Sequence, residues 1–100
     1  MNRLQPYVVR DPKLREMVRE YAKIEGRLET SAIRALLRVG LEYVFKRNPK
    51  ELPPIGTTTE IHKACWDWSN TQLKSLKEAV IYLLQVGLAL EAKRIGGKKK

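Results

Sequence analysis

The chain has 100 residues, enough for one domain or two very small ones, and a chain this short buries only a limited fraction of its surface. Its one cysteine excludes an intramolecular disulfide, and its longest apolar stretches are far too short to span a membrane. Twenty lysines and arginines against eleven acidic residues give a net charge of +9. This charge favours polyanionic partners, above all nucleic acid and anionic membranes, although it also serves ordinary solubility.

Positive charge is concentrated in the first half of the chain. Residues 1–50 carry twelve basic and six acidic side chains, whereas the second half is neutral once Lys98–Lys100 are set aside. We therefore expect a phosphate-binding face mainly on the first half. The N-terminal residues lead into no long apolar run, so we expect no signal peptide. With the single cysteine, this favours a cytoplasmic location.

A short strand is expected at the start of the chain. Residues 4–10 are β-prone around Tyr7, Val8 and Val9, and Pro6 places them at a sheet edge or at the beginning of a strand. An edge strand needs a partner, and this chain offers no second one. We therefore expect the strand to pair between two chains.

Two helices follow in the first half. Asp11 and Pro12 are typical of a helix start, and Gly26 is typical of a left-handed helix end. The second helix is expected to begin near Thr30-Ser31 and to end near residues 46–48. Apolar residues recur every three or four positions in both helices, which predicts one buried face on each.

A proline-rich segment, residues 49–56, predicts a stiff linker. A third helix is expected after Thr57–Thr59 and a fourth after a break at Ser69–Thr71, with Gly96-Gly97 ending the ordered part. The predicted division is a unit at residues 1–48, the linker at 49–56, a second helix pair at 57–95 and a basic tail at 96–100.

An internal repeat is the strongest feature of the sequence. A shift of forty-seven residues superposes Ala32–Leu41 on Ala79–Leu88 without a gap, and six of these ten positions are identical. A repeat of this kind defines the structural unit, and one copy of about forty-five residues cannot bury both of its helical stripes alone. Two copies must therefore interlock.

Residues 4–47 resemble the ribbon-helix-helix repressors of the Arc, MetJ and plasmid copy-control type. The resemblance is carried by the short strand ending near Arg10, the glycine turn at Gly26 and a second helix that opens with Thr30-Ser31. The tandem arrangement is similar to small regulators of archaeal viruses or plasmids. The resemblance implies a mostly α fold, with one short N-terminal strand pairing between chains and a second helix pair that lacks the strand. It also implies a homodimeric, sequence-specific regulator of transcription in a prokaryotic or archaeal cell, with double-stranded DNA as its partner.

In that family a two-stranded ribbon enters the major groove, and the N-terminus of the second helix binds a phosphate. Carried over to this chain, the base-reading face is expected to consist of Arg3, Gln5, Tyr7 and Val9. The opposite register, with Leu4, Val8 and Arg10 toward DNA, stays open. The residues expected to contact phosphate are Arg10, Arg27, Thr30, Ser31 and Arg34. Plain helix capping is an equally good role for the two hydroxyl residues, as is a solvated face for Arg27 and Arg34.

The second copy has lost its strand, because Pro53 and Pro54 stand where the strand would be. It keeps its apolar stripe, which suggests dimer support or cooperative assembly on DNA. The residues expected to pack in the dimer or a larger assembly are Val8, Ile33, Leu37, Leu41, Leu76, Val80, Leu83 and Leu90.

Other chemistry is weakly supported. His62 and Cys65 are spaced to touch one metal ion, but a zinc site normally needs four ligands, so we expect no metal and no cofactor. The sequence contains no catalytic constellation, so we expect no enzyme. Nothing indicates a small-molecule ligand, and apart from the net charge nothing indicates a membrane. The alternative function is a protein–protein module, such as a toxin-neutralising antidote or an assembly protein.

Overall fold

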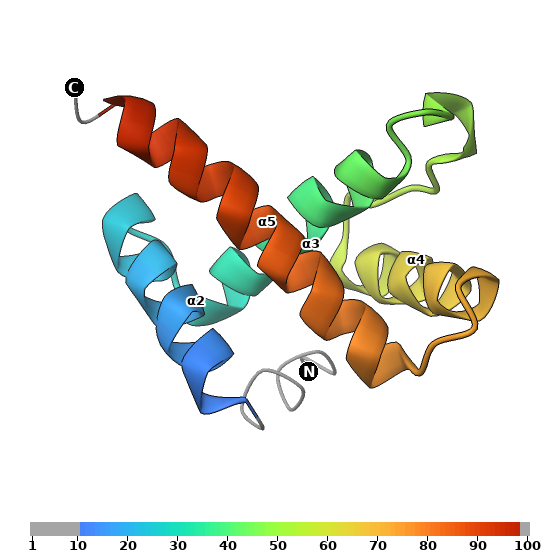
Figure 1. Cartoon of the computed structure of the whole chain (residues 1–100), viewed down its shortest axis with the longest axis horizontal. Helices are drawn as coiled ribbons and strands as arrows, with labels where there is room; N and C mark the ends of the chain where they lie inside the picture. Colours follow the sequence, from blue (N-terminus) through green and yellow to red (C-terminus); the bar gives the residue numbers. More distant parts are fainter. Residues whose placement is uncertain (1–10, 99–100) are drawn as a thin grey trace.

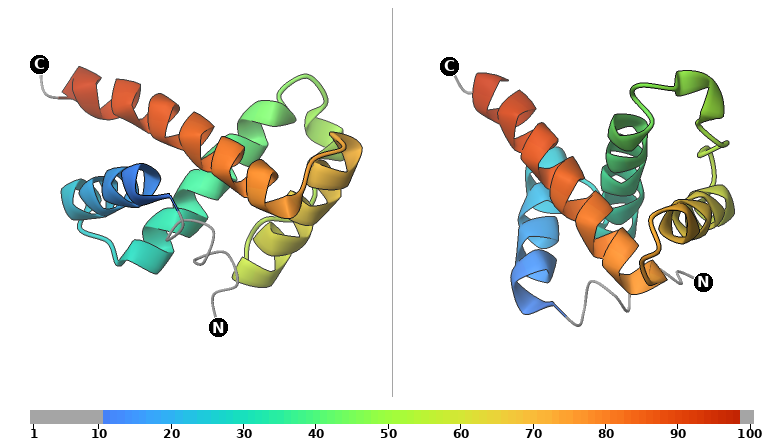
Figure 2. Two further views of the ribbon diagram at one scale, coloured as in Figure 1. Left: turned by 60° about the horizontal axis from the view of Figure 1, so that its bottom comes forward. Right: turned by 45° about the vertical axis from the view of Figure 1, so that its right-hand side comes forward.

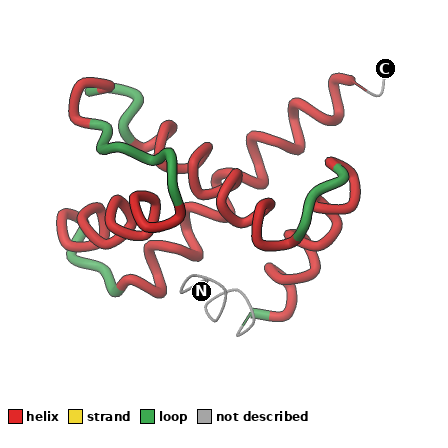
Figure 3. The backbone as a smooth tube through the Cα atoms, turned by 180° about the vertical axis from the view of Figure 1, so that it is seen from behind, coloured by secondary structure: helices red, strands yellow, loops and turns green. Residues whose placement is uncertain are grey.

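The computed structural model describes the backbone of residues 11–98 and the side chains of residues 11–96, and this part of the chain is helical (Figures 1 and 3). The elements in chain order are α2 (Pro12–Glu25), α3 (Glu29–Val44), the short 3-10 helix η1 (Pro49–Glu51), α4 (Thr58–Thr71) and α5 (Leu76–Lys98).

Local sequence explains where the helices begin. The carboxylate of Asp11 accepts a hydrogen bond from the Leu14 amide (3.1 Å), with Pro12 in the first turn of α2. Thr57 and Glu60 form a reciprocal capping box at the start of α4. Ser75 and Glu78 make the same reciprocal bonds ahead of α5.

The two helix pairs turn in the same way. α2 ends at Gly26 with a φ of 64°, and Leu73, forty-seven residues later, has a φ of 55° after α4. Positive φ is the left-handed region that glycine adopts freely, whereas leucine is strained there. The second turn thus keeps the left-handed backbone conformation of the first, but with a leucine in place of the glycine.

α3 and α5 cross at the centre of the molecule, with α2 and α4 on either side of the crossing (Figures 1 and 2). A Cβ added at Gly40 would lie 2.5 Å from the carbonyl oxygen of Leu83, and one at Gly87 would meet the carbonyl oxygen of Leu36. Gly87 is Gly40 shifted by forty-seven residues, and Leu83 is Leu36 shifted likewise. This reciprocity is the signature of a two-fold, isologous contact, here formed within one chain.

The core gathers around this crossing. It draws on all four long helices, and its largest fully buried side chains are Ile33, Leu36, Leu37, Leu41, Ile61, Leu83, Leu84, Val18, Val80 and Cys65. Leu52 and Ile55 of the linker are partly buried against the same core. The two copies therefore interlock within a single chain and share one hydrophobic core.

The fold class predicted from the sequence is wrong. Residues 11–98 form helices only, without a strand or a sheet, so the structure is not that of a ribbon-helix-helix protein with a β-ribbon. The expected strand at residues 4–10, its register and its base-reading residues Arg3, Gln5, Tyr7 and Val9 lie outside the described residues. The physical reason for the error is that a β-prone apolar run gives no information about a partner strand, and the helices find their partners inside the chain.

Several helix boundaries also differ from the expectation. α3 begins at Glu29 with Leu28 as its N-cap residue, so Thr30 and Ser31 lie within the first turn and do not cap the helix. α5 continues to Lys98, past the glycine pair expected to end it.

The residues expected to pack between chains lie mostly inside this one. Those that are buried within the chain are Ile33, Leu37, Leu41, Val80 and Leu83. Leu76 and Leu90 are half-buried, and Val8 lies outside the described part.

Candidate nucleic-acid interface

Arg34 connects the first turns of α3 and α4. Its guanidinium group donates one hydrogen bond to Ser31 Oγ (3.2 Å) and another to Thr58 Oγ1 (3.3 Å). One of these residues is three positions away on the same helix, and the other opens the second helix pair. Two hydroxyls and a cation from both halves therefore meet at one place.

Arg38, one turn further along α3, extends this cluster along the linker. Its Nε donates a hydrogen bond to the carbonyl oxygen of Ile55 (3.0 Å). Its Nη2 donates another to the carbonyl oxygen of Gly56 (3.5 Å). Because these acceptors are carbonyls, they hold the guanidinium in place without neutralising it. We call Ser31, Arg34, Arg38 and Thr58 the arginine–hydroxyl cluster.

The positive charges of the cluster are uncompensated within the described part of the chain. The ion pairs there involve Arg15 and Arg19 with Glu29, and Arg94 with Glu25 and Glu91, but neither arginine of the cluster. Hydroxyl and carbonyl partners orient a guanidinium while leaving its full charge to attract an anion. The cluster is therefore a preorganised positive site.

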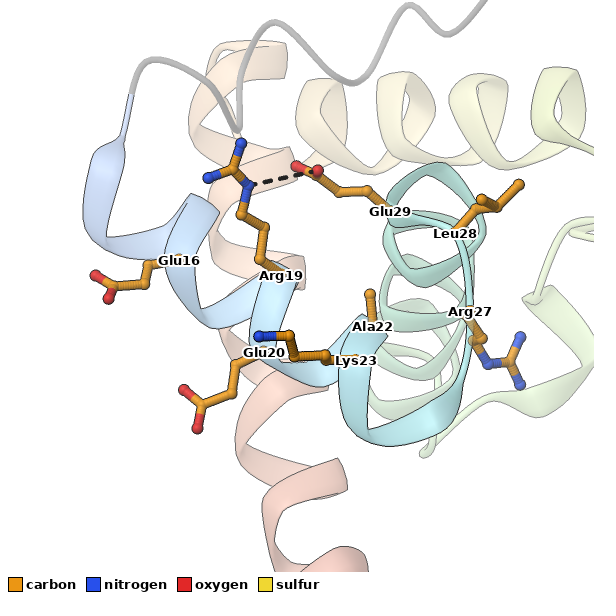
Figure 4. Close-up of a pocket in the computed structure, with 8 residues that line it drawn as sticks. All are labelled: Glu16, Arg19, Glu20, Ala22, Lys23, Arg27, Leu28 and Glu29. Atoms are coloured by element: carbon orange, nitrogen blue, oxygen red, sulfur yellow. Dashed lines mark ion pairs between the residues drawn. The ribbon is translucent and has the colours of Figure 1, made fainter.

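The neighbouring turn between α2 and α3 is more nearly neutral (Figure 4). There Arg19 and Glu29 point toward one another, with Nε and Oε2 3.6 Å apart, at one side of an open depression of about 670 Å³. Arg27 points away from this pair and is exposed. Arg27 thus takes no part in the ion pair between Arg19 and Glu29.

The N-terminus of α3 differs from those of α2, α4 and α5. Its N-cap residue is Leu28, which makes no side-chain capping bond and is 76% exposed, whereas Asp11, Thr57 and Ser75 cap the other three helices. Helix N-terminal amides that lack a cap attract anions through hydrogen bonds and the helix dipole. The half-exposed hydroxyls of Thr30 and Ser31 lie in this open turn.

The arginine–hydroxyl cluster has no counterpart in the second repeat. A shift of forty-seven residues replaces Ser31 by Glu78, Arg34 by Ile81 and Arg38 by Gln85. The two halves share a fold, but only the first carries the positive site. The excess of basic residues in the first half of the sequence favours the same half as the positive one.

Sequence reasoning located part of this site. The structure brings Ser31 and Arg34 together, and Thr30 and Arg27 lie nearby in the chain, whereas Arg10 lies outside the described residues. The sequence analysis did not identify Arg38 or Thr58, which follows the linker, as part of the site. The spacing of Arg34 and Arg38 on one helix face was a usable signal for the second arginine, but no pattern pointed to the hydroxyl twenty-four residues away.

A second polar cluster ties the ends of α2 and α5 together. Tyr21 donates a hydrogen bond to Glu91 (2.8 Å), and Arg94 donates to both Glu91 (3.0 Å) and Glu25 (2.6 Å). The hydrogen bonds from Arg94 lower the pKa of Glu91, and both carboxylates raise the pKa of Arg94. Burial, together with the bond to Glu91, raises the pKa of Tyr21 to about 12. These charges are matched, which fits a structural tie.

Other binding chemistry finds little support in the described part. Residues 11–98 contain no group of three or more side chains suited to hold a metal ion, and Cys65 is fully buried while its neighbour on the helix, His62, is half-buried. No described helix combines the length and the apolar character needed to cross a bilayer. Comparisons with family models, with curated proteins and with solved structures found no match for this chain.

Proposed function

We propose that this chain binds double-stranded DNA through its phosphate backbone and serves as a regulator of transcription in the cytoplasm. The arginine–hydroxyl cluster, with uncompensated charge on two oriented guanidinium groups, is the observation that carries the proposal. The net charge of +9 supplies the long-range attraction, and the open first turn of α3 supplies further phosphate ligands.

A duplex suits this site better than a single strand. Proteins that bind single strands stack bases on exposed aromatic side chains beside a basic groove. The cluster contains no aromatic residue, and the exposed aromatic side chains of the described part are Tyr43 on α3, Trp66 on α4 and Tyr82 on α5. Phosphate contacts alone position a protein on a duplex without reading its sequence, so specificity needs further contacts.

The arrangement implies binding by one chain. Because α3 and α5 cross within the chain, a two-fold scaffold exists without a second protomer, and only one of its halves carries the cluster. Such a scaffold fits a site without palindromic symmetry. No ribbon is needed for the phosphate contacts proposed here.

The test uses fluorescence anisotropy with a labelled duplex of arbitrary sequence, titrated at several salt concentrations. Replacing Arg34 by Gln should weaken binding several-fold and lower the salt slope by about 0.9 for each phosphate that the variant no longer binds. The matched control is Arg47→Gln, the same change on an exposed arginine beyond the C-terminal end of α3, which lies about 15 Å of helix from Arg34.

The two variants must differ for the proposal to stand. If both weaken binding equally, the chain binds by net charge alone and the cluster has no special role. Far-UV circular dichroism shows whether each variant keeps its helices, because Arg34 also connects α3 to α4. Failure of the wild-type chain to bind a duplex at low salt would contradict the proposal outright and favour the protein–protein alternative.

A further inference from the structure

Three hydroxyl residues stand at the start of α4, and Thr58 differs from its two neighbours. Thr57 caps the helix, because its Oγ1 accepts a hydrogen bond from the Glu60 amide (3.1 Å). Thr59 is exposed, and its side chain makes no hydrogen bond within the described part of the chain. The half-buried Thr58 instead accepts a hydrogen bond from Arg34 Nη1 (3.3 Å). Its oxygen therefore lies beside one of the uncompensated charges of the arginine–hydroxyl cluster.

A phosphoryl group on Thr58 Oγ1 would lie within reach of two guanidinium groups. Its terminal oxygens would be two bonds beyond Oγ1, to which Arg34 already donates. Arg38 is one helical turn away from Arg34, about 5–6 Å between Cβ atoms. Its present acceptors are the carbonyl oxygens of Ile55 and Gly56, three and two residues before Thr58. Because hydrogen bonds between two charged groups are about twice as strong as neutral ones, both guanidinium groups would favour the phosphate.

The backbone at the start of α4 also suits a phosphate. The amides of Thr58 and Thr59 make no hydrogen bond within the described residues, since the capping box uses those of Gly56, Thr57 and Glu60. Free amides and the positive end of the helix dipole stabilise a negative group on the first helical residue. Glu60 is the acidic residue of this turn, and its carboxylate already accepts two of these amide hydrogen bonds. Two arginines therefore oppose one carboxylate here.

The first repeat carries a negative charge at the matching position. Thr58 shifted back by forty-seven residues is Asp11, whose carboxylate caps α2, and Arg34 shifted forward is Ile81. The fold therefore accepts an acid at this place, in the half where the arginine is replaced by an apolar residue. In the half that has the arginine, the acid is replaced by threonine, which leaves the positive charge free. Phosphorylation of Thr58 would add the missing negative charge.

We propose that Thr58 is a phosphorylation site that switches off the arginine–hydroxyl cluster. A separate kinase would transfer the γ-phosphoryl group of a nucleoside triphosphate to Thr58 Oγ1. The new O–P bond forms as the bond from the γ-phosphorus to its bridging oxygen breaks. The hydroxyl proton passes to a base of the kinase, and the nucleoside diphosphate leaves. The attached phosphate then occupies Arg34 and Arg38 in place of a duplex phosphate. This inference rests on the proposed binding of DNA.

The single cysteine makes the modified chain accessible by chemical ligation. A thioester of residues 1–64 with phosphothreonine at position 58 joins residues 65–100 through Cys65, which yields the full chain. The control carries phosphothreonine at position 59, so that the same charge is added one residue further along, on an exposed side chain. Fluorescence anisotropy with the labelled duplex should show that phosphate at position 58 raises the dissociation constant about tenfold more than phosphate at position 59.

Phosphorus NMR measures contact between the phosphate and the cluster without DNA. The phosphate at position 58 should take up its last proton at a lower pH than the one at position 59, because two guanidinium groups stabilise its dianion. Arg34→Gln should remove most of this difference, and circular dichroism checks that each chain stays folded.

Each result separates the switch from the proposed function. Identical proton titrations at the two positions overturn the switch, as does an equal loss of duplex binding from both phosphorylated chains. Either result leaves the proposed function intact, provided that the unmodified chain binds the duplex. An unmodified chain that fails to bind overturns the proposed function and the switch together.

Discussion

Replacing Gly40 by Ala should destabilise the protein sharply, although alanine is the better helix former. The added Cβ would lie 2.5 Å from the Leu83 carbonyl oxygen and 3.1 Å from its carbonyl carbon, and both are backbone atoms that no rotamer change can move. The crossing helices must therefore separate by several tenths of an ångström, which loosens the core packed around them. Overpacking of this kind costs about 1–3 kcal/mol or more, and the gain in helix propensity returns about 1 kcal/mol. Because both contacts are with backbone atoms, we take the upper end of this cost and expect a net loss of about 2 kcal/mol.

The chain contains its own controls for this prediction. Gly87→Ala makes the reciprocal contact with Leu36, so it should cost a similar amount. Gly96→Ala lies in the same helix as Gly87, with no atom within 4 Å of the added Cβ, so it should be neutral or stabilising. Urea unfolding followed by circular dichroism measures all three. The reasoning is refuted if Gly40→Ala and Gly87→Ala are no more destabilising than Gly96→Ala.

Four further predictions concern single residues. Leu73→Gly should stabilise the protein by about 1 kcal/mol in urea unfolding, because it relieves a leucine at a φ of 55°, whereas Gly26→Ala should destabilise it. The lowered pKa of Glu91 means that its contribution to stability is complete above the unfolded-state pKa and is lost as the pH falls through the folded-state pKa, so Glu91→Gln should flatten this part of the acid unfolding curve. At high pH, the contribution of the Tyr21 side chain to stability should be lost as the pH rises from about 10 to about 12, because its pKa is raised in the folded state. Tyr21→Phe should remove that loss. Burial raises the pKa of Cys65 to about 12, so a thiol reagent should modify it only at the rate of unfolding; fast labelling of the folded protein would contradict its placement in the core.

The sequence allowed the presence of the helices and their internal repeat to be predicted, because both depend on spacing. The offset of forty-seven residues places Gly40 over Gly87 and Leu36 over Leu83, and these four residues make the central crossing. Apolar periodicity marked most of the buried faces, since a residue three or four positions away shares the same side of a helix, although Met17 and Leu73 of the predicted stripes are exposed.

What the sequence could not show is whether the partner of a packing face belongs to the same chain. A repeat that must interlock is satisfied equally by a second copy of the chain and by a second copy within it. The linker decides between them, and here it leads the chain from the end of α3 back to Thr58, beside Arg34. The expected dimer core became an internal one for this reason, and the same return of the chain created the hydroxyl partner that no local pattern predicted.

Joining both halves in one chain also changes what each half can become. In a two-fold homodimer every side chain occurs at both equivalent places, so a cation on one side must appear on the other. In this chain the place of Arg34 is taken by Ile81, and the place of Met17 by Ala64. Each half can thus hold a surface that the other lacks, while the reciprocal crossing of α3 and α5 keeps the shared fold. The first repeat contributes the two arginines of the cluster, and the second contributes the hydroxyl of Thr58 that helps to orient Arg34. A positive surface can therefore be confined to one side of a scaffold whose backbone is repeated, as the proposed phosphate contacts require.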